Sequence, residues 1–536
     1  MDAESTMQAP DISQYPALDD LQLGHLRHAH NLVAQKDNDW DGMGSARWGQ
    51  EWSDSYRYQL TEMAYMLGFA HFHHLPAAPG VFRQTFEEIL RKMQLPEVWA
   101  YWRETSRGSK WGNRDLTELR EGWRDPVAKE NIMFSGRYFA MLGMHSMLFD
   151  SDQYDRPGAI AFRWDPLFQG LTPEIYEYSL SSLADNLYWQ MAEQGWYGIV
   201  CEPNCLFLVC NQFPILGWRF LDLRKGTSVA DEVTRAYSSA WEKRGMLNEY
   251  GEYWRIWFVQ QDEPFMPNNG GGSMWTALNM NAWNRDLVHE LYPNQVRDEI
   301  RRLPNGLVTM AEPTAALEAR VARLQGRDPE FTRDLDYTWR SSAFGYTAAC
   351  MAEMGDTENL RGMLAYADQY MNPTWKDGGL FYPRNDASLD GDGNMVYMDR
   401  LTGNAMLGYA RLNVPDGLWK MYNHPWTAEH FRQPNLAGLT GHADVVRAWF
   451  DTERSLLALT LRPHGPDASD VRLEIGNIDP AQSWTLFSNG TQVATSADSA
   501  SPHVSTPDRV GAHFIDGRLV VDSALHGPTD FALTIH

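Results

Sequence analysis

The sequence contains few cysteines and no long apolar run, and each shortage excludes a class of protein. Only four of the 536 residues are cysteine, which is too few for the disulfide framework of a small secreted protein. No stretch approaches the roughly 18 uninterrupted apolar residues that a membrane-spanning helix needs. The start, MDAESTMQAPDISQYP, is acidic and polar and lacks the basic and apolar regions of an export signal. We therefore expect a cytoplasmic protein without a membrane span, whose thiols are reduced.

Positive charge is also scarce. Lys and Arg together number 46 against 70 Asp and Glu, so the formal net charge is −24. Such a chain repels nucleic acid and anionic membranes, because binding either requires a clustered basic surface. Hydrophobic residues nevertheless make up 43% of the chain and aromatic residues 12%, which is enough for a large core. We expect a small-molecule partner and no nucleic acid.

The composition changes near residue 453. All 24 Met and 21 of the 22 Trp precede residue 454. After it come short β-type runs at 456–461, 471–475 and 518–521, separated by Gly, Pro, Asn and Asp. Alternation of apolar and polar residues over four to eight positions, bounded by such turn-forming residues, is typical of strands. We expect a small antiparallel β-domain, of the sandwich type, over residues 454–536.

The first 450 residues are mostly helical by pattern. Apolar residues recur at three- and four-residue spacing, which predicts helices over 55–73, 85–93, 131–149, 179–193, 207–223, 229–243, 279–291 and 340–354. Roughly a dozen such helices suggest either an (α/α) toroid or an irregular bundle. We expect an N-terminal extension over 1–30 and a mainly α catalytic domain over 31–453.

Three cysteines fall within ten residues, in the segment YGIVCEPNCLFLVCNQFPILG at 197–217. Pro203 favours a first helical turn, so we expect Cys201 in a loop before a helix and Cys210 two turns inside it. A helix dipole there would lower the pKa of a thiol. Two alternatives are open: the cysteines are small buried hydrophobes, or Cys201 and Cys205 bind zinc, although no second ligand pair accompanies them.

Two other segments carry candidate groups. The loop DNDWDGMGS at 37–45 holds three aspartates, Asp37, Asp39 and Asp41, which could supply a general acid or base or could be solvated capping groups. The segment WKDGGLFYPRND at 375–386 predicts a turn or short hairpin that presents Tyr382, Arg384 and Asp386.

Two motifs carry several rare residue types at fixed offsets. The first is an aspartate-proline start followed by a helix, with Asp125, Pro126, Lys129, Glu130, Asn131, Ile132, Met133 and Gly136. The second is glycine, isoleucine, valine, cysteine, glutamate and proline at 198–203, with a second cysteine and its asparagine at Cys210 and Asn211. Together they resemble the linalool dehydratase-isomerase family over about residues 35–425, with weaker matches at Trp275-Thr276, Tyr292-Pro293, 353–356 and 380–384.

The resemblance implies an (α/α)6 barrel with a hydrophobic pocket, no metal and no organic cofactor. It implies reversible dehydration and isomerisation of a small hydrophobic alkenol or isoprenoid alcohol, in an oligomer whose neighbouring subunit supplies an aspartate. By match, Cys201 and Cys210 are the catalytic cysteines, and Asp39 or, second, Asp41 is the aspartate. The candidate substrate-binding residues are Arg137, Met133, Glu202, Tyr65, Trp275 and Tyr382.

This chain also departs from the family. Arg137 stands where the family has a histidine, and arginine cannot exchange a proton near neutral pH. Arg137 either faces the pocket and binds a more polar or anionic substrate, or turns outward to pair with Asp125 or Glu130. Position 45 is Ser45 instead of the expected tyrosine, and no tyrosine aligns cleanly in the first barrel helix, although Tyr56, Tyr58 and Tyr65 are near. The segment 105–124 is an insertion.

Two further functions compete with the dehydratase-isomerase. A carbohydrate-active barrel (hydrolase, lyase or epimerase) would use Asp37, Asp39, Asp41, Trp375, Tyr382 and Asp386 in an open polar cleft. A non-catalytic binding protein would have inert buried cysteines and a β-domain that binds a partner.

Overall fold

The computed structural model describes residues 8–44, 55–168, 170–265, 272–330, 343–412, 414–496 and 510–536. Within these residues the chain divides into two compact units. One contains residues 25–66 and 87–425 and is mainly helical. The other contains residues 1–24, 67–86 and 426–536 and includes the large β-sheets.

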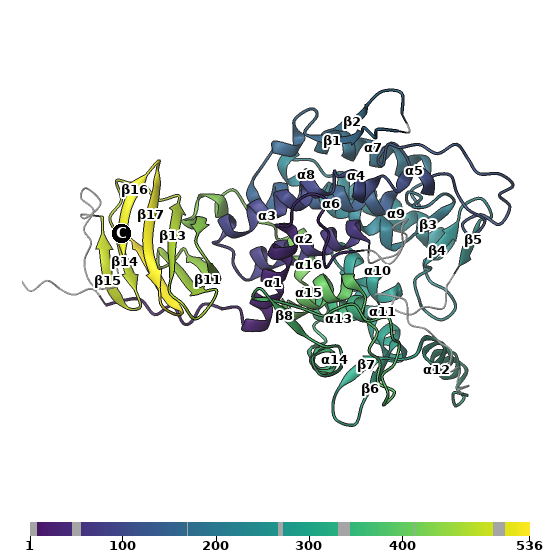
Figure 1. Cartoon of the computed structure of the whole chain (residues 1–536). Coiled ribbons are helices and arrows are strands. Elements are labelled where there is room, and N and C mark those ends of the chain that lie inside the picture. The colour runs from purple at the N-terminus through teal and green to yellow at the C-terminus, as the bar shows by residue number, and fades with distance from the viewer. Residues whose placement is uncertain are drawn as a thin grey trace, which may run out of the picture. The chain divides into compact units, whose positions relative to one another are not determined.

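The helices follow one another through the first 423 residues (Figure 1). Their bounds are α1 Asp20–Val33, α2 Tyr56–His73, α3 Pro79–Lys92, α4 Pro96–Trp99, α5 Trp102–Thr105, α6 Ile132–Phe149, α7 Leu180–Glu193, α8 Phe213–Lys225, α9 Val229–Arg244, α10 Gly272–Met280, α11 Arg285–Glu299, α12 Pro313–Gln325, α13 Ala343–Met354, α14 Thr357–Tyr370, α15 Leu407–Leu412 and α16 Gly417–Asn423. A 3₁₀ turn, η2 (Val209–Gln212), directly precedes α8.

Fully buried helices alternate with amphipathic ones. All 18 residues of α6 are buried, and so are eight of the nine residues of α10, Ser273 to Met280. The intervening α7 buries Leu180, Leu183, Leu187 and Met191 on one face, at three- and four-residue spacing, and exposes the other. A helix that is apolar all round needs neighbours on every side, whereas an amphipathic helix covers a core. The mainly α class expected from the sequence is therefore confirmed for this unit.

Glycines allow α6 and α8 to pack closely. A Cβ added at Gly217 would lie 2.3 Å from the ring of Phe139, and one at Gly143 would lie 3.1 Å from the carbonyl oxygen of Gly217. The two helices contact each other over several turns, since Gly136 also lies against Pro214. The segment with the cysteines leads directly into α8, and α6 carries Arg137. The contact between these helices therefore holds the cysteine segment and Arg137 in fixed positions relative to each other.

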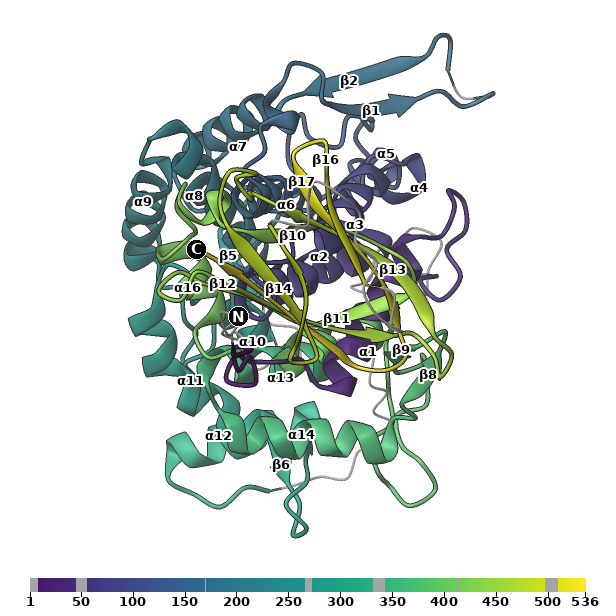
Figure 2. The same ribbon diagram turned by 90° about the vertical axis from the view of Figure 1, so that its left-hand side faces the viewer.

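The helical unit also contains small antiparallel sheets of two or three short strands. Their strands are β1 Ile160–Trp164, β2 Glu174–Tyr178, β3 Cys205–Phe207, β4 Ile256–Phe258, β5 Glu263–Phe265, β6 Ile300–Arg302, β7 Val308–Met310, β8 Thr374–Lys376 and β9 Gly379–Phe381. The hairpin of β8 and β9 is the one expected at 375–386. In Figure 2 the ribbon of β1 and β2 projects from the helices near α7.

The second unit holds two antiparallel sheets, drawn in green and yellow in Figure 1. Their orders are β10-β13-β17-β16 and β11-β12-β18-β14-β15, with bounds β10 Asn435–Thr440, β11 Ala443–Asp451, β12 Leu456–Pro463, β13 Ser469–Gly476, β14 Trp484–Ser488, β15 Thr491–Thr495, β16 Gly511–Ile515, β17 Arg518–Leu525 and β18 Thr529–Ile535. The strands expected at 456–461, 471–475 and 518–521 are confirmed. Strands β10 and β11 precede residue 454.

The N-terminal segment belongs to the same unit as these strands. Ile12 packs in a cluster with Leu456 and Phe487, and the hydroxyl of Tyr15 donates to Asp451 at 2.6 Å. This segment therefore adds apolar and polar contacts to the five-stranded sheet.

Two expected helices are wrong. The segment 207–223 is not one helix, because Cys205–Phe207 pairs as a strand with Ile256–Phe258 and Cys210 lies in the 3₁₀ turn before α8. The segment 279–291 is divided between α10, which ends at Met280, and α11, which begins at Arg285. In the first case pairing with a distant segment overrides the local helical spacing.

Candidate active site around the cysteine pair

Backbone hydrogen bonds hold the loop that carries Cys201. The amide of Asn131, just before α6, donates to the carbonyl of Cys201 at 3.0 Å. The amide of Cys201 donates in turn to the carbonyl of Cys205 at 2.9 Å, which closes a tight turn around Glu202 and Pro203. The start of α6 and strand β3 thus fix the position of Cys201.

The side chain of Asn211 ties this loop to the turn that carries Cys210. Its Oδ1 accepts from the amide of Ile199 at 2.6 Å, and its Nδ2 donates to the carbonyls of Ile199 at 3.1 Å and Phe207 at 2.9 Å. Gly198 lies directly against it: its φ is +124°, and a Cβ there would meet the Asn211 side chain at 2.5 Å. Only glycine suits that backbone and that approach.

This arrangement places the two thiols near each other. Cys201 is 3% exposed, Cys210 is fully buried, and Cys210 is close enough to act on the pKa of Cys201. Burial raises the pKa of Cys201 well above its usual value, and the neighbouring thiol of Cys210 raises it further. The expected lowering by a helix dipole is therefore wrong, because no helix begins at Cys201. Cys201 is a neutral thiol near pH 7.

Arg57, Tyr58 and Tyr101 border the thiols. The guanidinium of Arg57 lies 4.0 Å from the ring centre of Tyr101 and 4.7 Å from that of Tyr58. Burial raises the pKa of Tyr58, which Arg57 partly opposes, and both thiols lie within electrostatic reach of its hydroxyl. Tyr58 is therefore a neutral phenol beside Cys201 and Cys210.

Arg137 has a partner that the sequence did not suggest. Its Nη1 donates to Oε1 of Glu62, from α2, at 2.8 Å, and its Nε donates to the sulfur of Met133 at 3.0 Å. Arg137 is fully buried and Glu62 nearly so. The alternative that Arg137 turns outward to Asp125 or Glu130 is wrong, since Glu130 pairs with Arg120 and Asp125 accepts from Tyr178.

Aromatic rings enclose the guanidinium of Arg137. It lies 4.1 Å from the ring centre of Phe213, 5.0 Å from that of Tyr58 and 5.2 Å from that of Trp275. Trp275 stacks on Tyr346 at 4.1 Å. Because Tyr58 contacts both Arg57 and Arg137, it joins the thiol pair to the Glu62–Arg137 pair in one buried site.

Several buried polar atoms of this site have no hydrogen-bond partner within the described part of the chain. Four are donors, namely Arg137 Nη2, Tyr65 Oη, Tyr346 Oη and Trp275 Nε1. Oε2 of Glu202, beside Cys201, is a fifth such atom and an acceptor. An unmet buried polar group costs about 1–3 kcal/mol, so these atoms mark where a ligand or water belongs.

Three sequence candidates lie apart from the thiols. Asp39 and Asp41 are exposed; Oδ1 of Asp39 accepts from the amide of Asp41, and Asp41 pairs with Lys376 at 3.8 Å. The hydroxyl of Tyr382 hydrogen-bonds Asp368 and Arg411, in a separate polar cluster that includes His25. Ser45 lies outside the described residues.

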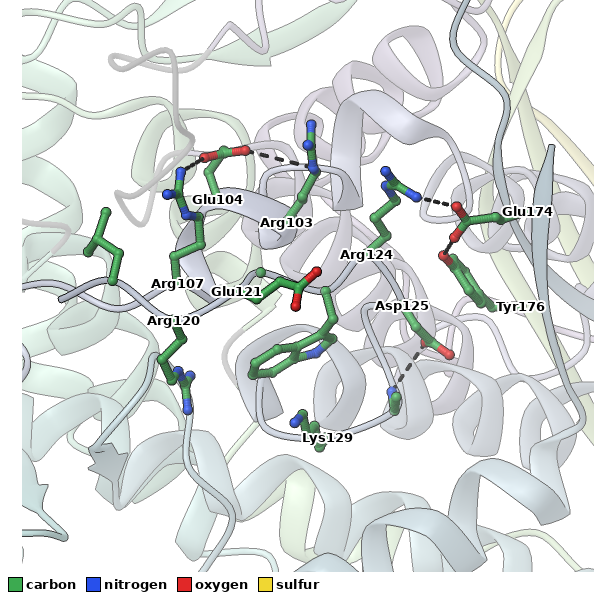
Figure 3. Close-up of a pocket in the computed structure, with 14 residues that line it drawn as sticks. Arg103, Glu104, Arg107, Arg120, Glu121, Arg124, Asp125, Lys129, Glu174 and Tyr176 are labelled. Atoms are coloured by element: carbon green, nitrogen blue, oxygen red, sulfur yellow. Dashed lines mark hydrogen bonds and ion pairs between the residues drawn. The ribbon is translucent and has the colours of Figure 1, made fainter. Parts of the chain in front are cut away.

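A separate pocket of about 790 Å³ is lined by residues of the segment 103–129 and by Glu174 and Tyr176 (Figure 3). The segment 105–124 and its neighbours in the sequence supply most of its lining. Arg107 pairs with Glu104 at 3.1 Å and Arg124 pairs with Glu174, as the dashed lines in Figure 3 show. Since carboxylates already pair with these arginines, the pocket is a mixed-charge cavity instead of a strong anion site.

Five residues of the candidate site were not predicted from the sequence, namely Arg57, Glu62, Tyr101, Phe213 and Tyr346. Each approaches the site from an element distant in sequence from the cysteines, so local spacing gave no sign of it. A charged residue in a largely apolar helix was the available signal, and it fits Arg57 and Glu62 in α2 and Arg137 in α6.

All four cysteines are free thiols. Among the described residues, no group of three or more His, Cys, Asp or Glu side chains could hold a metal ion. No helix of the same residues is long and apolar enough to cross a membrane.

A buried pair of thiols, with a neighbouring tyrosine and a charge-balanced arginine in an aromatic enclosure, defines a candidate site for acid-base chemistry. The family model of linalool dehydratase/isomerase matches residues 57–388, more than half of the chain. The chain belongs to this family. The match includes Arg137, Cys201, Cys210 and Trp275 but not Asp39 or Asp41.

Several solved structures resemble the chain weakly. An α-amylase from Clostridium perfringens covers 66% of this chain and 86% of its own, at 13% identity and a TM-score of 0.36. A possible member of the GH105 family from Salmonella enterica covers 76% and 96% at 14% identity, with a TM-score of 0.35. An unsaturated glucuronyl hydrolase from Streptococcus agalactiae covers 78% and 98% at 10% identity, with a TM-score of 0.39. Such TM-scores are too low to assign a fold or an activity.

Proposed function

We propose that the protein is a cofactor-independent hydro-lyase and isomerase that acts on a hydrophobic alkenol or isoprenoid alcohol. The observation that carries the proposal is the proximity of the two buried thiols to each other, beside Tyr58 and an aromatic enclosure. Family membership supports the reaction type. We also propose that the alternating buried and amphipathic helices form an (α/α)6 barrel, and that the enzyme works in the cytoplasm.

In the proposed dehydration one thiol donates its proton to the substrate hydroxyl, and the C–O bond breaks to release water. The resulting thiolate then takes a proton from the carbon next to the allylic cation, so the thiol is restored and an alkene forms. In isomerisation the cation keeps that proton: water adds to the other end of the cation instead, and the thiolate takes the proton that the added water loses, so an isomeric alcohol forms and the thiol is restored. The raised pKa of Cys201 supports the role of proton donor over that of covalent nucleophile, because a thiol with a raised pKa is protonated at neutral pH.

The aromatic rings have a second role in this proposal. The faces of Tyr58, Phe213 and Trp275 already enclose a guanidinium, at 4.1 to 5.2 Å. The same negative ring faces stabilise a transient allylic cation without trapping it. Bulk water is kept away by the burial of these side chains.

We further propose that Asp39 or Asp41 acts in the site of a neighbouring copy, in a homo-oligomer. Both aspartates are exposed and therefore available to a neighbour. The carbohydrate-active alternative has less support, because two of its carboxylates are tied to arginines: Asp37 to Arg91 and Asp386 to Arg384.

The test is direct conversion. Purified protein is incubated with linalool and shorter and longer alkenols in H₂¹⁸O, and products are separated by gas chromatography and mass spectrometry. The proposal expects an alkene formed by loss of water, an allylic isomer, and ¹⁸O in the recovered alcohol. Absence of all three from every alkenol, with hydrolysis of a glycoside panel instead, would refute it.

A further inference from the structure

Resting on the proposed function, we propose that Glu62 and Arg137 form a charge-balanced subsite that binds an uncharged oxygen of the substrate and rejects a carboxylate. The pair lies 2.8 Å apart inside the aromatic enclosure and carries no net charge.

The unsatisfied atoms around the pair define what it binds. Arg137 Nη2 and Trp275 Nε1 can only donate hydrogen bonds, and neither meets an acceptor among the described residues. The hydroxyls of Tyr65 and Tyr346 are likewise unmet, and both lie within electrostatic reach of Glu62 and Arg137. Arg137 Nη2 and Trp275 Nε1 therefore call for an acceptor oxygen, which a hydroxyl or a carbonyl provides.

The charge of the substrate's oxygen group decides which kind of acceptor the subsite binds. Arg137 is fully buried and already neutralised by Glu62, so a carboxylate would leave one uncompensated negative charge in a dry aromatic site. An alcohol or aldehyde leaves the site neutral. Glu62 therefore selects against acids without touching the substrate, and Arg137 makes the contact. This inference replaces the expectation that Arg137 favours an anionic substrate.

The subsite also constrains the proton path. A guanidinium hydrogen-bonded to a carboxylate keeps its proton at any working pH. Arg137 accordingly holds the substrate oxygen but does not protonate it, and that step falls to a thiol. Arg137 is in this sense a binding residue, and Glu62 a positioning and specificity-determining residue.

Binding is measured in a Cys201→Ser background, which stops turnover in the proposed mechanism, by isothermal titration calorimetry on the full chain. The probes are linalool for a hydroxyl, citral for a carbonyl, geranic acid for a carboxylate and myrcene for no oxygen. With the native pair we expect linalool and citral to bind at least about tenfold more tightly than geranic acid. Glu62→Gln leaves Arg137 unpaired and is expected to reverse that order.

Two further variants keep the test decisive. Glu62→Leu/Arg137→Met replaces the pair by apolar groups of similar size, which folded proteins tolerate, and should bind linalool no better than myrcene. Glu299→Gln weakens a comparable buried contact, with Arg320 at 3.4 Å, away from the thiols and should change no preference.

The inference is overturned if Glu62→Gln leaves the ratio of acid to alcohol affinity unchanged. It is equally overturned if the apolar double variant binds linalool as tightly as its parent, since the donors would then serve only water. Failure of the proposed function has a different signature: wild-type protein converts no alkenol, while the four probes still follow the expected order of binding.

Discussion

The side-chain amide of Asn211 spans the backbone of Ile199, with one hydrogen bond to its amide at 2.6 Å and one to its carbonyl at 3.1 Å. These contacts join the loop of Cys201 to the turn of Cys210, although the two cysteines are nine positions apart in the sequence. Asn211 is therefore expected to be a positioning residue of the site.

Asn211→Ala should separate the thiols. It leaves the buried amide and carbonyl of Ile199 without partners, which costs about 1–3 kcal/mol for each unmet group. We expect turnover to fall by at least about tenfold and Cys201 to react faster with a thiol reagent. Gln212→Ala is the matched control, because Gln212 is an adjacent buried amide that contacts Leu208 and Tyr237 instead. Normal turnover with a slow, unchanged thiol reaction would refute the positioning role.

The Glu62–Arg137 pair should show strong coupling in unfolding experiments. Removing one partner leaves a buried charge, so Glu62→Leu and Arg137→Met should each cost about 3–5 kcal/mol of unfolding free energy. The double variant should be considerably more stable than the sum of the two losses predicts. Urea unfolding of the four proteins measures this coupling. Additive losses would mean that the two side chains do not interact in solution.

Glu353 predicts a pH dependence of stability. It is buried and accepts hydrogen bonds from the amides of Leu418 and Trp419 and from Asn281; burial raises its pKa from 4.5 to about 7. The folded state therefore holds this proton more tightly than the unfolded state. Stability from this group is present below pH 4.5 and is lost as the pH rises to about 7.

Comparison with Glu353→Gln isolates the effect. Relative to the variant, the wild type should lose up to about 3 kcal/mol of unfolding free energy between pH 4.5 and 7, and nothing more above that range. Denaturant unfolding at half-unit pH steps measures the difference. A constant difference across the range would show that Glu353 keeps an ordinary pKa.

Local patterns predicted much of the fold. The period of the apolar residues predicted α2, α6, α7 and α9 nearly to their ends, because each has a continuous buried face that local spacing records. The segment around Cys205 misled the prediction, because its partner strand lies some fifty residues further along the chain. Pairing between segments far apart in the sequence does not change the spacing of apolar residues within each segment, so that spacing cannot predict it.

The candidate site was partly predictable for the same reason. The nine-residue spacing of Cys201 and Cys210 predicts a common site, and in the structure Cys210 is close enough to influence the pKa of Cys201. The partner of Arg137 could not be predicted, since Glu62 is 75 residues away and comes from another helix. The pKa of Cys201 was predicted in the wrong direction because it depends on burial, which only the folded structure defines.

The proposed contribution of a neighbouring copy can be tested by complementation. Cys201→Ser and Asp39→Asn should each be inactive alone. If each site combines thiols from one copy with an aspartate from the next, mixing the two variants under conditions that exchange subunits should restore part of the activity. Asp41→Asn mixed in place of Asp39→Asn tests the second candidate. No recovery in either mixture, in a protein shown to be oligomeric, would place the acid within the same chain.

The central claim is that the neighbouring thiols perform the reaction, and single cysteine variants test it most directly. Cys201→Ser, Cys210→Ser and Cys350→Ser are compared for alkenol dehydration by gas chromatography, with thermal unfolding as a check of folding. Cys350 is equally buried but belongs to α13, outside the thiol pair. The account predicts that the first two variants lose at least about a hundredfold in rate while remaining folded, and that Cys350→Ser stays active. Wild-type rates in both Cys201→Ser and Cys210→Ser would contradict it.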